Sequence, residues 1–91
     1  AQAVAEKMAL ISRKHQVISI THLPQIAAMA DSHYLIEKSA DEGKTVTKIV
    51  RLSEAESITE IARLLGGASI TDAVMSNALE MKQMAEKTKK Y

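Results

Sequence analysis

The chain has 91 residues, of which 46% are apolar and 25% charged, and a formal net charge of +1, which is the balance of one small globular domain. Cysteine is absent, which excludes disulfides, thiolate metal sites and cysteine nucleophiles. The near-zero charge provides no global field toward nucleic acid, and no apolar run approaches the ~18 residues that span a bilayer. With no secretory signal pattern either, we expect an intracellular protein without a membrane partner.

The amino terminus predicts a helix that runs to about Lys14. Its apolar side chains recur at helical spacing: Val4, Ala5, Met8 and Ile11. Neither an initiator methionine nor an N-cap residue precedes this pattern at Ala1. We therefore expect residues 1–91 to be a single fragment of a longer protein.

A β-branched run at residues 16–20 predicts a strand that is apolar enough on both faces to be a buried parallel strand. Thr21 and His22 follow, and Pro24 begins a short helix that reaches about Asp31. Open α/β sheets present side chains to ligands at the carboxyl end of such a strand, ahead of a helix. His22 is therefore the candidate site residue, and the alternative is a loop histidine hydrogen-bonded to the backbone.

Residues 33–38 and 45–52 predict an antiparallel hairpin, with polar turn residues and one glycine at 41–44. The next helix has two candidate capping boxes, Ser53 with Glu56 and Ser57 with Glu60. Its apolar stripe is Ile58, Ile61, Ala62 and Leu65, and the Gly66-Gly67 pair is expected to end it.

The last helix is expected from about Thr71 to Lys89. Its apolar stripe is Val74, Ala78, Met81 and Ala85, and its methionines, Met75, Met81 and Met84, are assigned to the core. Three lysines near its end, Lys87, Lys89 and Lys90, could touch DNA phosphates, but a solvated helix end is the safer interpretation.

Other catalytic arrangements find little support in the sequence. The three histidines lack metal-ligand spacing, and no serine lies in a Gly-x-Ser-x-Gly turn, so we expect neither a metal site nor a hydrolase triad. His15 and His33 are expected to be surface or half-buried residues. The Gly66-Gly67 pair lacks the Gly-Lys-Ser/Thr of a P-loop, which favours the helix C-cap over a phosphate loop.

Two separated motifs resemble a known family. Residues 21–31, Thr-His-Leu-Pro-Gln-Ile-Ala-Ala-Met-Ala-Asp, and residues 60–67, Glu-Ile-Ala-Arg-Leu-Leu-Gly-Gly, are similar to the carboxyl-terminal part of the bacterial DNA repair protein family RecN. The resemblance covers essentially the whole chain. That family is SMC-like and has an ABC-type (P-loop NTPase) ATPase head split by a coiled coil.

The resemblance implies an α/β fragment of such a head, its carboxyl-terminal lobe, with one buried strand and an antiparallel hairpin flanked by about four helices. It implies that His22 is the switch histidine, which contacts the γ-phosphate when two heads of a homodimer sandwich ATP. It further implies ATP and Mg²⁺ as cofactors, DNA as a partner, double-strand break repair and recombination as the role, and the cytoplasm at the bacterial nucleoid as the location.

The Walker A loop, a recognisable Walker B strand, the ABC signature and the D-loop are missing from the sequence. We therefore expect the fragment alone to hold no nucleotide and to be inactive, and its uncovered strand to favour self-association. Two other classes stay open: a non-enzymatic interaction module in which His22 is structural, and a DNA-binding piece. The DNA-binding class is the weaker one, since the charge is near zero and only Tyr34 and Tyr91 are aromatic.

Overall fold

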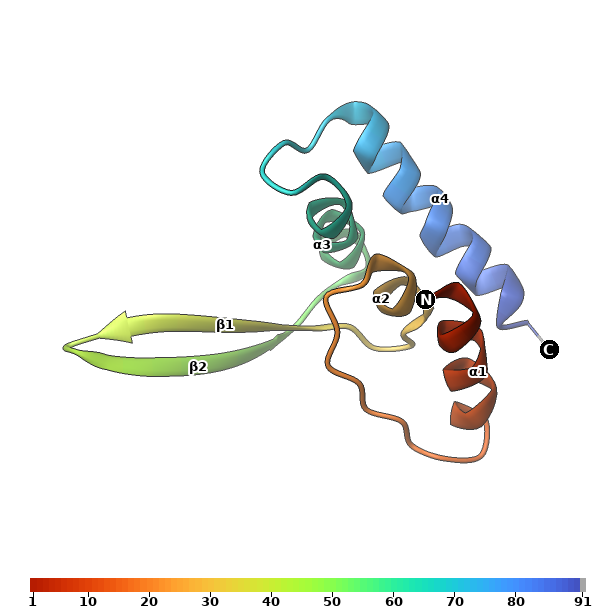
Figure 1. Cartoon of the computed structure of the whole chain (residues 1–91), viewed down its shortest axis with the longest axis horizontal. Coiled ribbons are helices and arrows are strands. Elements are labelled where there is room, and N and C mark those ends of the chain that lie inside the picture. Colours follow the sequence, from red (N-terminus) through yellow and green to blue (C-terminus); the bar gives the residue numbers. More distant parts are fainter. Residues whose placement is uncertain (91) are drawn as a thin grey trace.

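Four helices and one β-hairpin make up the computed structural model, which describes residues 1–90 and leaves Tyr91 outside the described residues. In chain order the elements are α1 (Gln2–Ser12), α2 (Pro24–Met29), β1 (Tyr34–Asp41), β2 (Lys44–Arg51), α3 (Glu54–Gly66) and α4 (Asp72–Thr88) (Figure 1). The molecule measures 49 by 35 by 21 Å, and its hairpin extends away from the helices. The α/β class, with an antiparallel hairpin and four helices, is confirmed.

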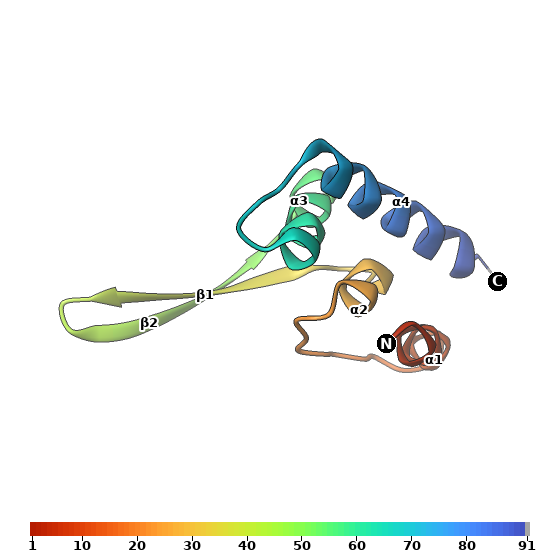
Figure 2. The ribbon, with the colours of Figure 1, turned by 45° about the horizontal axis from the view of Figure 1, so that its top comes forward.

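The short helix α2 lies at the centre of the helical part. It contacts α1, α3 and α4, and Figure 2 shows it between α1 and the other two helices. Small side chains dominate the core, in which Ile61 is the largest side chain that is fully buried. The core residues are Ala5, Ala9, Ala27, Ala28, Met29, Ile61, Ala62, Ala78 and Ala85. Such a thin core fits a chain of this length.

The predicted apolar face of α1 is only partly correct. Ala5 and Ala9 are buried, whereas Val4 is 54% and Ile11 53% exposed. The reason is that α1 packs chiefly against α2, whose six residues cover only a narrow stripe of it.

Helix α3 resolves the choice between the two capping boxes in favour of the first. The Ser53 hydroxyl accepts from the Glu56 backbone N–H at 3.2 Å, and the Glu56 carboxylate accepts from the Ser53 N–H at 2.8 Å. Ser57 lies one turn inside the helix, where its hydroxyl has another partner. The helix ends as predicted at Gly67, whose φ of 65° is the left-handed conformation that glycine adopts without strain.

Thr71 is the N-cap of helix α4, and its hydroxyl accepts from the Val74 N–H at 3.2 Å. The predicted stripes of α3 and α4 face the core as expected. Met84 is an exception, because it is 60% exposed and the assignment to the core was wrong for it. Within residues 1–90, no helix combines the length and the apolar character that crossing a membrane requires.

The hairpin pairs Tyr34 with Arg51 at its root and Asp41 with Lys44 at its tip. Strand β1 extends farther than predicted and β2 begins and ends one residue earlier, so only two residues, Glu42 and Gly43, form the turn. Their φ values of 49° and 78° are both positive, as in the two-residue turns whose twist matches that of the strands. Nearly all residues of both strands are exposed.

The strand predicted at residues 16–20 is not formed. These residues are extended but pair with no other segment of residues 1–90, and Ile18 is 82% and Ile20 85% exposed. An extended segment becomes a strand only where a neighbouring strand supplies backbone hydrogen bonds. In this chain β1 and β2 pair only with each other, so the prediction of one buried strand was wrong for the structure of this chain.

Candidate functional site

His22 lies on the extended segment that links α1 to α2. Its side chain is exposed and makes no hydrogen bond or ion pair to any other residue in the described part of the chain. The backbone beside it is fixed, because the Thr21 hydroxyl accepts from the Leu23 N–H at 3.0 Å. Pro24 then opens α2, where its missing N–H has no partner to lose. Within residues 1–90 the His22 side chain makes no hydrogen bond to the backbone, unlike the alternative that the sequence analysis considered.

The helix that follows His22 is firmly placed. Ala27, Ala28 and Met29 on α2 are buried against the neighbouring helices. The side chain of His22 is free of hydrogen bonds and ion pairs within residues 1–90, whereas the chain immediately after it leads into a packed helix. Such an arrangement can present an imidazole to a ligand that arrives from outside the chain.

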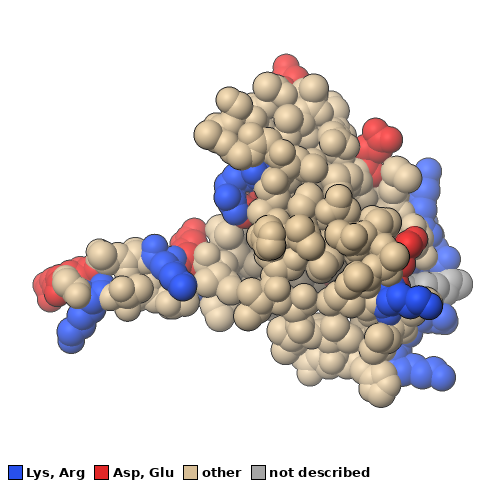
Figure 3. Space-filling model, in the orientation of Figure 1, with Lys and Arg blue, Asp and Glu red and all other residues tan. Residues whose placement is uncertain are grey.

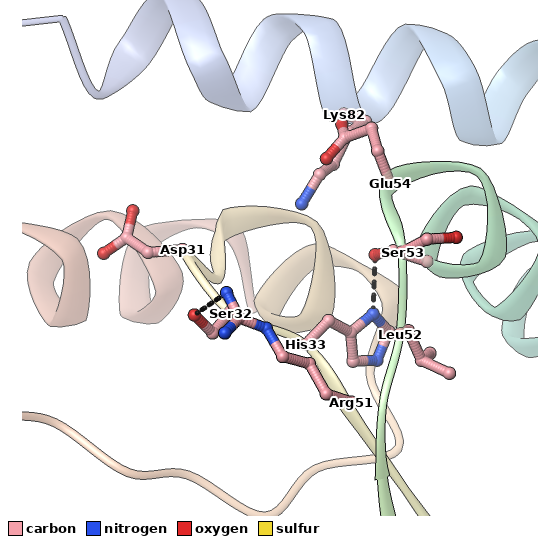
Figure 4. Close-up of a pocket in the computed structure, with 9 residues that line it drawn as sticks. Asp31, Ser32, His33, Arg51, Leu52, Ser53, Glu54 and Lys82 are labelled. Carbon is pink, nitrogen blue, oxygen red and sulfur yellow. Dashed lines mark hydrogen bonds between the residues drawn. The ribbon is translucent and has the colours of Figure 1, made fainter.

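A second histidine, His33, lies in a pocket of about 260 Å³ between the hairpin root, α3 and α4 (Figure 4). Its Nδ1 shares a hydrogen bond of 2.7 Å with the hydroxyl of Ser57. The pocket also carries two cationic and two acidic side chains, those of Arg51, Lys82, Asp31 and Glu54. His33 is half-buried, as the sequence analysis expected, and His15 is exposed.

Burial lowers the pKa of His33 from its ordinary value of 6.5, and the positive charge of Lys82 adds to this effect. The negative charge of the Glu60 carboxylate acts in the opposite direction but does not outweigh these two effects on the pKa. Ser57 is only 2% exposed, and its hydroxyl is bonded to His33. This bond attaches the start of β1 to α3.

The described residues offer little to a metal ion or to a polyphosphate. Among residues 1–90 there is no group of three histidine, cysteine or acidic side chains that could hold a metal ion. Gly66 and Gly67 end α3, and a Cβ atom at Gly66 would come within 3.1 Å of the Val74 side chain. This glycine pair therefore serves the α3–α4 connection, as the C-cap interpretation predicted.

Figure 3 shows a visible side that is mostly uncharged over the helices. Lys and Arg gather mainly along its right-hand edge, and the hairpin carries side chains of both signs. Lys87 and Lys90 are exposed as expected, but Lys89 is not simply solvated. Its ammonium group contacts the Asp31 carboxylate at 3.1 Å and the Glu86 carboxylate at 3.3 Å.

The sequence analysis missed two features: the His33–Ser57 bond and the burial of Lys82, which is 5% exposed. A signal for the second was present. Lys82 lies four residues after Ala78 and three before Ala85, which places a lysine on the apolar stripe of α4.

Comparison with known proteins supports one family. No family model matches the chain. The chain is 44% identical over 89 residues to the DNA repair protein RecN of Bacillus subtilis and 42% identical over 89 residues to that of Halalkalibacterium halodurans. Each of these matches covers 98% of the chain and 16% of the relative. The RecN protein of Deinococcus radiodurans is 41% identical over 79 residues, which are 87% of the chain and 14% of that protein.

The resemblance to RecN is thereby confirmed along almost the full length of the chain. The chain spans only about a sixth of each of the first two relatives, 16% of their length.

Proposed function

We propose that this chain, a relative of part of RecN, is the carboxyl-terminal lobe of an ABC-type ATPase head in a DNA repair protein, and that His22 is its switch histidine. The observation that carries the proposal is the placement of His22: an exposed imidazole, without a partner in residues 1–90, directly ahead of a packed helix. The name DNA repair protein RecN, which the relatives share, supports a role in DNA repair. Within that role we propose double-strand break repair and recombination.

The residues of this chain fit one contact to a nucleotide rather than a complete site. Residues 1–90 contain no candidate metal cluster, and the sequence has no P-loop, so other parts of the protein would hold ATP and Mg²⁺. When bound, ATP supplies the γ-phosphoryl group that is transferred to water.

His22 can act on that reaction through its two ring nitrogens. A ring N–H can donate to a phosphate oxygen, where negative charge accumulates during phosphoryl transfer, or the ring can hold a water in line. The Thr21–Leu23 hydrogen bond fixes the backbone on both sides of the imidazole, which limits the freedom lost when it binds.

The proposal extends to the partners. A second ATPase head would complete the nucleotide site from the opposite side in a homodimer. DNA would bind through other parts of the protein, since the chain has a net charge of only +1 and mixed surface charge. The proposed location is the cytoplasm, at the bacterial nucleoid.

The test is ATP turnover by the full-length protein that carries this segment, with and without DNA. We expect His22→Ala to lower turnover by about a hundredfold while nucleotide binding is kept, as for a group that acts mainly in the transition state. His15→Ala is the matched control, because His15 is also exposed but lies at the end of α1. Unchanged turnover in His22→Ala would refute the switch role.

The isolated chain is expected to show no ATP turnover above a control without protein.

A second candidate function, a protein-interaction module with a structural His22, is favoured by one observation. Ile18 and Ile20 are more than four-fifths exposed, at 82% and 85%, and side chains of this kind mark contact surfaces when they cluster. Normal turnover in His22→Ala, together with loss of a binding partner in Ile18→Lys, would favour the module.

A further inference from the structure

The carboxyl end of α2 is held by two lysines of α4. The carbonyl oxygen of Ala30, the C-cap of α2, accepts hydrogen bonds from the ammonium groups of Lys82 and Lys89, each at 3.3 Å. These lysines follow Ala30 in the sequence by 52 and 59 positions. The last carbonyl groups of a helix lack intrahelical partners and carry partial negative charge, so cationic donors suit them.

Lys82 is not a solvated lysine that happens to lie near a carbonyl group. It is 5% exposed, and it projects from α4 toward α2 (Figure 4). It lies on the same stripe of α4 as the buried Ala78 and Ala85. Burial of an ammonium group is costly unless hydrogen bonds compensate it, and the Ala30 carbonyl is the partner that Lys82 has in the described residues.

This contact lies one short helix away from His22. With six residues, α2 is about 9 Å long at 1.5 Å per residue, and a helix of this length would not persist by itself. Its position is therefore set by its buried face and by the bonds at its ends. A shift of the end at Ala30 would be passed through this short packed helix to Leu23 and His22.

We propose that Lys82, with Lys89 as a second donor, is a positioning residue that fixes α2 and thereby the imidazole of His22. This inference rests on the proposed switch role of His22. It assigns to α4 a part in the reaction although none of its side chains would touch the nucleotide.

The experiment compares Lys82→Met with the unmodified full-length protein. Methionine keeps the apolar stem of the side chain and removes the ammonium group. We expect kcat for ATP to fall about tenfold with KM unchanged, since a displacement on the order of 1 Å can cost up to about a hundredfold in rate. Hydrogen exchange of the backbone amides at residues 22–30 should become faster, which is a readout independent of activity.

The dependence on His22 is tested in the double variant. If Lys82 acts through His22, Lys82→Met should cause no further loss of turnover in a His22→Ala background. Lys82→Arg should restore part of the rate, and Lys87→Met, an exposed lysine of the same helix, should change neither readout. All rates are measured well below the unfolding midpoint of each variant. If Lys82→Met does not fold, Lys89→Met provides a milder change at the same carbonyl group.

The outcomes separate the two proposals. A large loss in His22→Ala with normal turnover in Lys82→Met and Lys89→Met would overturn the positioning role alone. Equal losses from Lys82→Met in both backgrounds would also overturn it, because the lysine would then act independently of His22. Unchanged turnover in His22→Ala would overturn the switch role and the positioning role together.

Discussion

The side chains of His33 and Ser57 are joined by a hydrogen bond of 2.7 Å that links the hairpin root to α3. At the hairpin root itself, the His33 carbonyl accepts from the Leu52 N–H at 2.9 Å, which extends the pairing of the two strands. Ser57 is buried, so its hydroxyl would lose its partner without access to water if His33 moved. His33, which the sequence analysis expected to be an ordinary surface or half-buried histidine, therefore has a structural role, whereas the His22 side chain is exposed.

The lowered pKa of His33 predicts how stability depends on pH. Because its pKa is lower in the folded chain than its ordinary value of 6.5, the unfolded chain binds the proton first as the pH falls. The free energy of unfolding should therefore decrease as the pH falls from about 6.5 to the folded-state pKa of His33. Above about pH 6.5 this contribution should be fully present. Urea denaturation of the 91-residue chain at several pH values measures this slope.

The matched variants are His33→Asn and His15→Asn. An asparagine amide at position 33 can keep a hydrogen bond to Ser57 but does not titrate, so this part of the slope should disappear. His15 is exposed, and its replacement should leave the slope in place. Identical slopes in all three proteins would show that His33 does not contribute.

Helix α3 shows how element boundaries depend on a few polar contacts. The capping box between Ser53 and Glu56 satisfies two backbone N–H groups at the helix start, and its hydrogen bonds lower the pKa of Glu56. The second candidate capping box, Ser57 with Glu60, is not formed. The Ser57 hydroxyl is bonded to His33, and the Glu60 carboxylate accepts from the Arg63 Nε at 2.9 Å.

Ser53→Ala should lower the free energy of unfolding by about 1 kcal/mol, the usual cost of losing an N-cap hydroxyl. Ser69→Ala is the control, because Ser69 is exposed and its hydroxyl makes no hydrogen bond in residues 1–90, so its effect should stay within about 0.5 kcal/mol. Urea denaturation with unchanged m-values would measure both. Equal effects of the two changes would contradict the assignment of the cap.

The molecule as a whole leaves one extended segment without a strand partner. Residues 16–20 make no backbone hydrogen bond to another segment in the described chain, and the side chains of Ile18 and Ile20 are exposed. A segment with these properties is a template for pairing with another strand, from a second copy or from the remainder of a larger sheet.

We therefore expect the isolated chain to self-associate, with a mass in light scattering that rises with concentration. Ile18→Lys should keep it monomeric, because a lysine at this position opposes pairing of two copies. Ile49→Lys is the control, since Ile49 is 68% exposed but lies on the hairpin. A monomeric mass of the unmodified chain at all concentrations would contradict the prediction, and loss of association in Ile49→Lys alone would move the contact to the hairpin.

Local sequence patterns were enough to predict the helices, the hairpin and the resemblance to RecN. Apolar periodicity, capping-box pairs and the glycines of turns and helix ends act over a few residues, so they can be read locally. The resemblance that singled out His22 also depends on contiguous residues, and the comparison with RecN confirmed it. The role of His22, the nucleotide, the DNA and head partners and the location stay predictions.

Contacts between segments that are distant in the sequence depend on how the helices and strands pack. Whether residues 16–20 pair depends on the presence of a neighbouring strand, which no local pattern contains. The partners of Ser57, Lys82 and Lys89 lie 24, 52 and 59 positions away and are brought together only when α2, α3 and α4 pack. A hydrogen bond requires a specific geometry but can join residues at any separation in the sequence. These contacts therefore follow from how the elements pack and cannot be read from local sequence.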